Sequence, residues 1–489
     1  MSDTNVPPEA VARPKRPELL AAAIEDRVER EQLQPGTPLG TEAQLMAQYE
    51  VSRETLRNAI RQLERHGVAV MRRGGGGGGG GLTVAATASM TAVRAITAHL
   101  EFSDIGWDEI VEARALLDMQ AAKLASRRID ASARSRLRQI SAELDQGPST
   151  VRAIGKRHLA LPGAIAEISG NAVVQLFSQA LSNWSTDVLP ADLGSPVVRD
   201  RETQRVNAIL RTISEAIATG DADAAGAAVE AFSASSLKVC KLLEERRRRA
   251  SAKDWMELPS GSEGEGKLAQ RLALALARDV AAKGWPRERL SDEAGLIERF
   301  GVSRSVLREA IRMLELHGIV RPQRGRGGGL MIGRPNADYT IASAKRYLRR
   351  AGLGASDYLA VREALERGAI HLAVTRAHAA DLRAISELNS RLQAADDTQI
   401  TALAIEWHAQ LSQLGRNRAL SLLLRTLFTL TEEAQPRLPA DIAQTLRKRH
   451  ARLTQALLDR DEPRAQLVAQ EHVAWLNQVL ELGLAALHP

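Results

Sequence analysis

The clearest pattern of apolar and polar positions along the chain is a helical one that occurs twice. Residues 51–67 read VSRETLRNAIRQLERHG and residues 302–318 read VSRSVLREAIRMLELHG, with twelve of the seventeen positions identical. In each copy apolar residues recur three or four positions apart, which predicts an amphipathic helix. Ser52 and Ser303 stand where a side-chain oxygen accepts an orphan N–H at a helix start, and Gly67 and Gly318 suit the left-handed residue after a helix end.

The segments around each copy also repeat. A helical run precedes each copy, then a short helix, which Thr41 with Gln44 opens in the first case and Ser291 or Asp292 in the second. Two short β-prone stretches follow each copy, so both units read as helix-turn-helix domains with a wing. The predicted first helices are 17–31 and 267–283, and the predicted strands are 68–73 with 82–85 and 319–324 with 330–332.

Eight consecutive glycines, Gly74–Gly81, separate the two strands of the first wing. Glycine in such numbers costs conformational entropy to order, so the run indicates a mobile wing tip. A phosphate-binding loop is the alternative, but no Lys-Ser/Thr pair follows and no strand leads into a helix there. We therefore expect no nucleotide site in this segment.

A long helical region follows each winged unit. The predicted fold class is mainly α, with two winged helix-turn-helix domains, each carrying a small β-hairpin wing, alternating with two all-α helical bundles. The Gly/Ser/Glu-rich stretch between the halves reads as a linker. The predicted boundaries are 17–86 and 267–334 for the winged domains, 88–250 and 338–489 for the helical domains, and 251–266 for the linker.

Composition supports a basic protein built around packed cores. The 489 residues are 44% hydrophobic but only 3% aromatic, and the formal net charge is +7, which favours a polyanionic partner. Cys240 has no second cysteine to pair with, and it reads as a small apolar residue rather than a nucleophile. We expect no membrane partner and a cytoplasmic location, because neither a signal peptide nor a membrane-length apolar run is seen.

The two repeated helices carry arginines on the face opposite their apolar residues. A helix of this length with a basic face suits the major groove of double-stranded DNA, where arginine binds guanine or phosphate. One such helix would be an ordinary surface helix, whereas two with the same caps and wings favour DNA binding. The candidate DNA contacts are Arg53, Thr55, Arg57, Arg304, Ser305 and Arg308 on the helices, with Arg72, Arg73, Arg324 and Arg326 on the wings.

These motifs resemble the winged-helix domain of the GntR family of bacterial transcription regulators. The resemblance covers about 17–86 and 267–334, and it implies an operator DNA partner with Arg53, Arg57, Arg304 and Arg308 as contacts. The family often places arginine after the glutamate of the short helix, where this chain has Ala43 and Ala294. We expect operator affinity or sequence preference to differ accordingly.

The long helical regions resemble the FCD effector domain of the FadR subfamily. Both contain its first-helix pattern, VEARALLDMQAAKLA and VREALERGAIHLA, and its later turn, ISGN and LGRN. The resemblance implies an effector that is a small organic acid, held by a metal and by arginine. Arg362 is the candidate effector residue, with Arg114 a weaker one, although pairing of Arg362 with Glu366 at i+4 is the equal alternative.

Three histidines of the second region are placed to meet. His450 and His472 lie eleven residues before and after Asp461, at the turn of a helical hairpin, so both reach the same level. With His408 from a third helix they suit a divalent metal, zinc or nickel, against the alternative of three unrelated histidines. The resembled family adds an aspartate at the position of Ala404.

The first helical region lacks this set. The equivalent positions hold His158, Pro162, Leu210 and Phe232, and one histidine makes no metal site. We therefore predict that the first region is a degenerate effector domain without metal.

The leading hypothesis is a sequence-specific transcription regulator, more specifically a repressor, that responds to a small carboxylate. Because one chain carries both DNA-binding heads, it is expected to act as an intramolecular pseudo-dimer or as a homodimer on a near-palindrome. The alternative is a metal-dependent hydrolase using the three histidines, which leaves the repeated basic helices unexplained. An RNA-binding protein is a third option that sparse aromatics disfavour.

Overall fold

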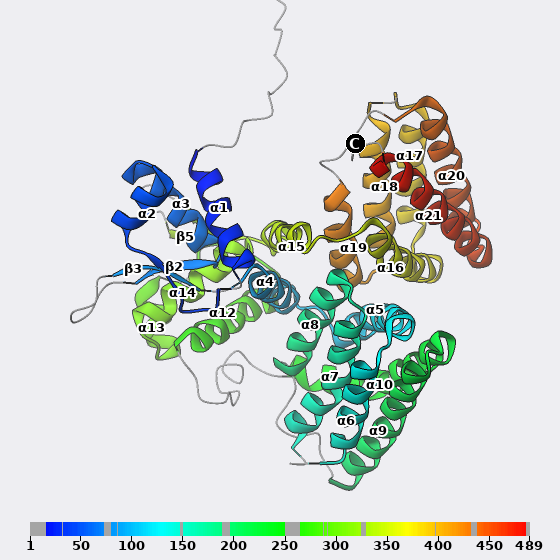
Figure 1. The fold of residues 1–489 in the computed structure, drawn as a ribbon, viewed down its shortest axis with the longest axis horizontal. Coiled ribbons are helices and arrows are strands. Elements are labelled where there is room, and N and C mark those ends of the chain that lie inside the picture. The colour runs from blue at the N-terminus through cyan, green and yellow to red at the C-terminus, as the bar shows by residue number, and fades with distance from the viewer. Residues whose placement is uncertain are drawn as a thin grey trace, which may run out of the picture. The chain divides into compact units, whose positions relative to one another are not determined.

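The structure is a computed structural model of the chain. The structure describes residues 16–31, 33–72, 80–85, 87–146, 150–187, 196–249, 265–286, 288–290, 292–323, 329–396, 398–431 and 438–485. It divides into two compact units, Met1–Arg94 and Ala95–Pro489. The described part is mainly helical with two small antiparallel sheets, which confirms the predicted fold class (Figure 1). None of its helices is both long and apolar enough to cross a membrane.

The first unit is a winged helix-turn-helix domain. Leu45, Leu56, Leu63 and Leu82 are fully buried in its core, which joins the three helices to the sheet. A third strand, which the sequence analysis did not predict, extends the wing into a sheet of order β1-β3-β2. Its elements are α1 (Arg16–Arg30), β1 (Pro38–Gly40), α2 (Glu42–Tyr49), α3 (Arg53–Arg65), β2 (Ala69–Arg72) and β3 (Gly81–Val84).

Local chemistry sets the helix boundaries of this domain as the sequence indicates. Thr41 and Gln44 form a capping box at the start of α2, and the Ser52 hydroxyl accepts the Thr55 N–H at the start of α3. Gly67 follows α3 with a φ of +69°, a left-handed conformation that glycine adopts without strain. The short connection between α2 and α3 includes Glu50, also left-handed at φ +50°.

The first helical domain belongs to the second unit and follows a helix, α4, that begins in the first. Its long helix α5 packs against α7, α8, α9, α10 and, in the other helical domain, α16. Trp184 and Phe177 are fully buried in this bundle. Its elements are α4 (Ala88–Phe102), α5 (Trp107–Arg128), α6 (Ala131–Glu143), α7 (Val151–Ile168), α8 (Ala172–Asp187), α9 (Pro196–Thr219) and α10 (Ala222–Arg249).

The second winged domain repeats the plan of the first. Asp292 and Ser303 cap its second and third helices, and Gly318 has a φ of +74°. Where the first domain has a third strand, the described residues here form a single bridge between Arg289 and Met331. Its elements are α12 (Glu265–Ala282), α13 (Glu293–Phe300), α14 (Arg304–Leu316), β4 (Val320–Gln323) and β5 (Gly329–Ile332).

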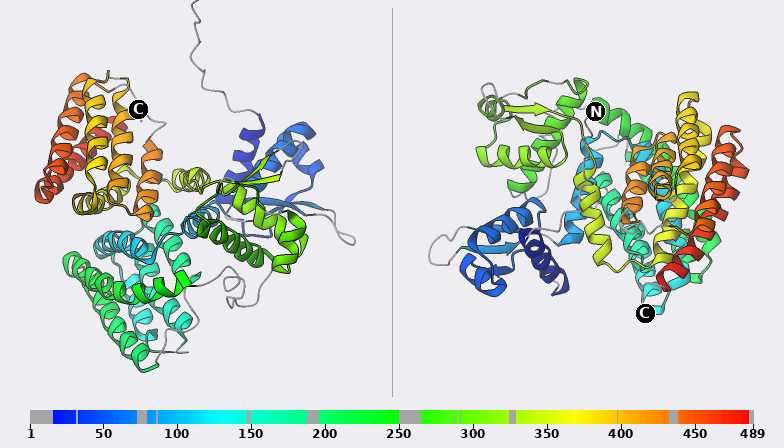
Figure 2. Two further views of the ribbon diagram at one scale, coloured as in Figure 1. Left: turned by 180° about the vertical axis from the view of Figure 1, so that it is seen from behind. Right: turned by 90° about the horizontal axis from the view of Figure 1, so that it is seen from above.

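The second helical domain is a bundle whose helices run side by side, yellow to red in Figure 2. Its core includes Trp407, Leu392, Leu457 and Ile385, all fully buried. The last two helices form the predicted hairpin, because α20 ends at Leu458 and α21 begins at Glu462. Its elements are α15 (Asp338–Arg350), α16 (Ala355–Arg376), α17 (Ala379–Ala394), α18 (Ile400–Leu414), α19 (Arg418–Thr431), α20 (Ala440–Leu458) and α21 (Glu462–Ala485).

Candidate metal centre and DNA-binding helices

Helix α3 presents its arginines to solvent in the first unit. The Arg53 and Arg57 side chains are 67% and 54% exposed, and both lie near one carboxylate, Glu42 of α2, at 3.4 and 3.5 Å. Such exposed pairs contribute little to stability. Glu42 therefore lies near both guanidinium groups while leaving them exposed. Thr55 lies in the first turn of α3, and its hydroxyl is 2.9 Å from that of Ser52.

Helix α14 presents the same face in the second unit. Arg304 is 69% exposed, and its Nε lies 3.8 Å from Glu293 of α13, the counterpart of Glu42. Arg308 is exposed one turn further along, and the Ser305 hydroxyl is 2.8 Å from that of Ser303. In both helices the first arginine thus pairs with the glutamate at the start of the preceding helix. Of the four wing arginines, Arg73, Arg324 and Arg326 lie outside the described residues, as does the side chain of Arg72.

Three buried histidines converge in the second helical domain, from α18, α20 and α21. One ring nitrogen each of His408, His450 and His472 lie within 4.8 Å of one another, and the ring centroids are 5.0–5.3 Å apart. The side chains are only 2–4% exposed. The predicted convergence across the α20–α21 hairpin is therefore present in the structure.

Burial makes all three histidines neutral near pH 7. Loss of solvation lowers the pKa of His408, lowers the pKa of His450 to about 3, and holds the pKa of His472 well below its usual value. A neutral imidazole offers one nitrogen lone pair to a metal. Each ring is thus in the protonation state that a metal ligand requires.

The hydrogen bonds of this cluster leave histidine nitrogens available to bind a metal ion. His450 Nδ1 donates to the Leu446 carbonyl oxygen at 2.8 Å, while His450 Nε2 and both His472 nitrogens are buried with no hydrogen-bond partner among the described residues. Such unpaired buried nitrogens cost about 1–3 kcal/mol each. A metal ion would satisfy them, and ligating histidines usually donate their other N–H to a backbone or carboxylate oxygen. The residues present therefore fit a divalent metal.

A carboxylate that the sequence analysis treated only as a partner for arginine adjoins this cluster. Glu366 on α16 lies 2.9 Å from His408 Nδ1 and accepts a hydrogen bond from Arg362 Nε at 3.0 Å. Burial opposes ionisation of Glu366, but the charge of Arg362 and the nearby His408 outweigh it and lower its pKa. The pairing of Arg362 with Glu366, one turn along the same helix, is thus observed. The Arg362 guanidinium also lies 5.2 Å from the centroid of the Phe428 ring.

The other acidic candidates near the histidines are absent or turned away. Ala404, at the position of the family's aspartate, is buried and offers no ligand atom. Glu406 is exposed and pairs with Arg391 on α17 at 3.2 Å. Within the part of the chain that the structure describes, the three histidines form the one group of His, Cys, Asp or Glu side chains spaced to hold a metal.

The described residues of the first helical domain bring no such set together. Leu210 is fully buried, and the Nε2 of His158 is 2.8 Å from the Asn207 side-chain oxygen. Phe232 lines a cavity of about 210 Å³ instead. The prediction that this domain holds no metal stays a prediction.

The two helical domains contact each other through equivalent residues. The Asn171 side chain donates to the Asp357 carbonyl oxygen, and Asn417, at the same place in the second domain, donates to the Glu109 carbonyl oxygen, both at 2.9 Å. Arg128 at the end of α5 pairs with the Asp357 carboxylate at 2.7 Å. This reciprocal exchange is typical of two-fold interfaces.

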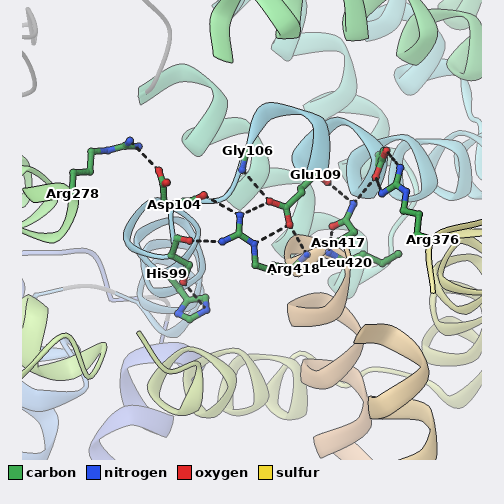
Figure 3. Close-up of polar contacts among 11 residues, drawn as sticks. His99, Asp104, Gly106, Glu109, Arg278, Arg376, Asn417, Arg418 and Leu420 are labelled. Carbon is green, nitrogen blue, oxygen red and sulfur yellow. Dashed lines mark hydrogen bonds and ion pairs between the residues drawn. The ribbon is translucent and has the colours of Figure 1, made fainter. Parts of the chain in front are cut away.

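One side of this junction carries additional ion pairs, shown in Figure 3. Arg418 binds the Glu109 carboxylate, with Nε to Oε1 at 3.0 Å, and donates to the carbonyl oxygens of Ser103 and Asp104 at 2.8 and 3.0 Å. Arg376 donates to Glu112 at 3.0 Å. The residue that corresponds to Arg418 in the first domain is Ala172, so the two sides differ.

The helices α5 and α16 cross closely at Gly368. A Cβ atom at Gly368 would lie 2.1 Å from Cδ1 of Leu116, so any larger residue requires the Leu116 side chain to move. The residue equivalent to Gly368 on α5 is Gln120, and the residue equivalent to Leu116 on α16 is Ala364. The close contact therefore has no counterpart on the other side of the junction.

Comparison with known proteins accounts for all four domains. A family model described as bacterial regulatory proteins, gntR family, matches residues 18–77 and 268–329. A model of the FCD domain matches residues 109–234 and 357–474. The chain thus contains each domain twice, in alternation.

Named relatives are similar to one half of the chain. HTH-type transcriptional regulator RmpR of Mycobacterium gastri is 28% identical over 235 residues, which is 45% of this chain and 84% of the relative. The Exu regulon transcriptional regulator of Escherichia coli strain K12 is 21% identical over 192 residues, 38% of this chain and 73% of the relative. A solved structure, Streptococcus agalactiae GntR, matches 45% of this chain and 99% of its own, at 17% identity and a TM-score of 0.34.

Proposed function

Because the chain belongs to the gntR family of bacterial regulatory proteins and contains two FCD domains, we propose that it is a metal-dependent, acid-responsive repressor. The protein is a DNA-binding transcription regulator and not an enzyme. The proposal adds that a small organic acid, bound at a metal in the second helical domain, releases the operator. The observation that carries it is the buried, neutral trio of His408, His450 and His472, whose free nitrogens face no protein partner among the described residues.

In this proposal α3 and α14 enter the major groove. Their first turns offer Arg53 with Thr55 and Arg304 with Ser305, beside backbone N–H groups that favour phosphate. Arg57 and Arg308 lie one turn further along and are exposed, so they are available for guanine or phosphate. Arg53 and Arg57 pair weakly with Glu42, and Arg304 pairs weakly with Glu293; DNA phosphates can displace exposed pairs of this kind.

The metal is proposed to bind the acid directly. His408, His450 and His472 would hold the ion, which when bound supplies a Lewis-acidic site for a carboxylate and leaves coordination positions open. Glu366 orients His408 through Nδ1 and cancels the charge of Arg362. An incoming carboxylate competes with Glu366 for Arg362, which gives the site a way to distinguish its empty from its bound state.

The operator is proposed to be read by one chain. The reciprocal Asn171 and Asn417 contacts support an arrangement in which the two helical domains pair within the chain, as two subunits of a dimer would. Two heads in one polypeptide then suit a near-palindromic site.

Selection of bound duplexes from random DNA tests the proposal. One recurrent near-palindrome is expected, and its affinity should fall steeply with salt, with a slope of about −0.9 per phosphate contact. Failure to retain any duplex at low salt would refute DNA reading by these helices. Carboxylic acids added at this stage should release the DNA from the wild type but not from His450→Ala. Release from both would remove the metal from the mechanism.

Arginine substitutions provide the matched test. Arg57→Ala and Arg308→Ala should each weaken operator binding by about 1–3 kcal/mol, the range for a good base contact. Arg205→Ala removes an equal charge from an exposed site on α9 and should leave the affinity unchanged. Equal losses in all three variants would indicate a general charge effect instead of contacts by α3 and α14.

A further inference from the structure

The first helical domain, which lacks the histidine trio, contains a cavity of about 210 Å³. The cavity lies between α5, α7, α9 and α10, and most of its wall is apolar, including Trp107, Ile110, Ile154, Val206 and Phe232. An engineered apolar cavity of roughly 150 Å³ binds benzene, so this one has room for a bicyclic aromatic molecule. Its mainly apolar lining with a few polar groups is typical of a small-ligand site.

The charged groups in the wall do not favour an anion. The lining contains one cation, Arg114, and two acids, Asp118 and Glu202. Arg114 Nε donates to Asp118 Oδ2 at 3.0 Å, and its Nη2 donates to the Ser182 hydroxyl at 3.3 Å. Burial raises the pKa of Asp118 while Arg114 opposes that shift, and the ion pair gives Arg114 a counter-charge within the wall. A carboxylate would therefore meet no uncompensated cation.

The hydrogen-bond network assigns one polar feature of the wall. The Asn207 amide nitrogen donates to the Leu144 carbonyl oxygen at 3.2 Å and to Asp145 Oδ1 at 2.7 Å, which fixes the orientation of the amide. Its oxygen, 2.8 Å from His158 Nε2, must then accept, so His158 donates from Nε2. Burial lowers the pKa of His158, which keeps the ring neutral, and its Nδ1 is left as an acceptor.

We propose that the first helical domain binds a neutral, mainly apolar ligand, of the size of a bicyclic aromatic alcohol, whose hydroxyl donates to His158, without any metal. The chain then has two sensory sites of opposite chemistry, one for an anion on a metal and one for an uncharged molecule in an apolar cavity. The proposal concerns ligand binding alone and does not depend on DNA binding or on the metal in the second domain.

Calorimetric titration of the full chain with 2-naphthol tests the proposal. After treatment with a chelator, the wild type is expected to bind one equivalent of 2-naphthol. It should bind 2-naphthoate, which has the same ring size but is charged, at least tenfold more weakly. Absence of 2-naphthol binding, tighter binding of 2-naphthoate, or loss of binding on chelation would each overturn the proposal.

Two variants locate the ligand. Val206→Phe fills the cavity and should reduce 2-naphthol affinity at least tenfold, whereas Gln204→Phe adds the same ring at an exposed position of α9 and should not. His158→Leu removes the acceptor with little change in volume and should cost about tenfold, the value of one hydrogen bond. The His158 variant keeps the test decisive if Val206→Phe does not fold. Unchanged affinity in a folded variant of either kind would refute the assigned site.

Discussion

At the scale of single residues, the second helical domain buries polar and charged side chains that are usually exposed to solvent. Arg362, Glu366 and the three histidines are all less than a tenth exposed. Glu366 links the arginine to the histidines, because its carboxylate accepts a hydrogen bond from Arg362 Nε and lies beside His408 Nδ1. Buried charges are tolerated when they are paired and hydrogen-bonded. Removal of any one member of this network would therefore leave another buried group without its partner.

Substitution of His450 by alanine should abolish tight binding of the divalent metal. Two histidines are too few to retain a zinc or nickel ion in competition with a chelator, because structural and catalytic sites supply at least three protein ligands. Metal content per chain after dialysis, measured by mass spectrometry, is expected to fall from one to near zero. His371→Ala, an exposed histidine on α16 paired with Glu462, is the control and should keep the metal.

Substitution of Glu366 by glutamine should weaken metal binding by about 10–100-fold, the usual effect of removing an outer carboxylate. It also leaves the buried Arg362 cation without its counter-charge, which should destabilise the domain by about 3–5 kcal/mol. Competitive titration with a chelating dye and thermal unfolding measure the two effects. Glu406→Gln on the exposed face of α18 should change neither quantity, and metal affinity equal to wild type in Glu366→Gln would exclude the orienting role.

At the scale of elements, the ends of the two repeated helices have diverged. His66 after α3 is 2.6 Å from Glu25 of α1, an ion pair when the ring is protonated. Its counterpart after α14, His317, is buried against Phe102 and His99 of α4 and Tyr339 of α15, with ring centroids 5.1, 6.2 and 5.6 Å away. The second winged domain is thereby attached to the helix that precedes the first bundle.

Acid should loosen this attachment. Burial lowers the pKa of His317 to about 3, and burial with the charge of Arg425 lowers that of His99 to about 4, although Asp338 opposes the latter shift. Both rings are neutral when folded but take up protons below about pH 6.5 when unfolded. The free energy of unfolding therefore has its full value above pH 6.5. It falls as the pH drops toward 4, by up to about 1.4 kcal/mol per pH unit for each ring.

Thermal unfolding between pH 7 and pH 5 measures this effect. His317→Phe keeps an aromatic ring in the same place but cannot take up a proton, so its melting temperature should fall less on acidification than that of the wild type. His371→Phe, at an exposed position, is the comparison and should behave as the wild type does. Identical acid sensitivity of His317→Phe and wild type would show that the pair does not titrate on unfolding.

Sequence patterns predicted the features that depend on local chemistry. Serine caps, the terminal glycines and helical periodicity located α3 and α14, and symmetry about Asp461 brought His450 and His472 together. The role of Glu366 beside His408 was missed, because α16 and α18 are brought together only by packing. The strand β1 was missed for a similar reason, since three residues give no periodic pattern and its partner lies more than forty residues later.

At the scale of the whole molecule, the junction between the helical domains ties the two sensory halves together. Helix α5 lines the apolar cavity with Ile110 and Arg114 and touches the second domain with Glu109 and Glu112. Helix α16 carries Glu366 toward the histidines and crosses α5 at Gly368. Each site is thus formed in part by one of the two helices that cross at the junction.

A small addition at the crossing should disrupt this junction. Gly368→Ala puts a Cβ atom 2.1 Å from Leu116, and overpacking of this kind costs about 1–3 kcal/mol. Gly163→Ala, within α7 and with nothing near its Cβ position, should instead be neutral or stabilise the helix. Thermal unfolding and operator affinity are the measurements, and Leu116→Ala should restore both in the double variant. Absence of rescue would show that the clash lies elsewhere.

The pairing of Leu116 with Gly368 makes the contact between the duplicated domains directional. In a symmetric pairing of first domains Leu116 would face Gln120, and in one of second domains Ala364 would face Gly368, so neither pairing repeats the contact of Leu116 with Gly368. At this crossing the two halves are thus complementary to each other. At this crossing neither half has to match a copy of itself, which is the constraint that a two-fold interface between identical subunits imposes.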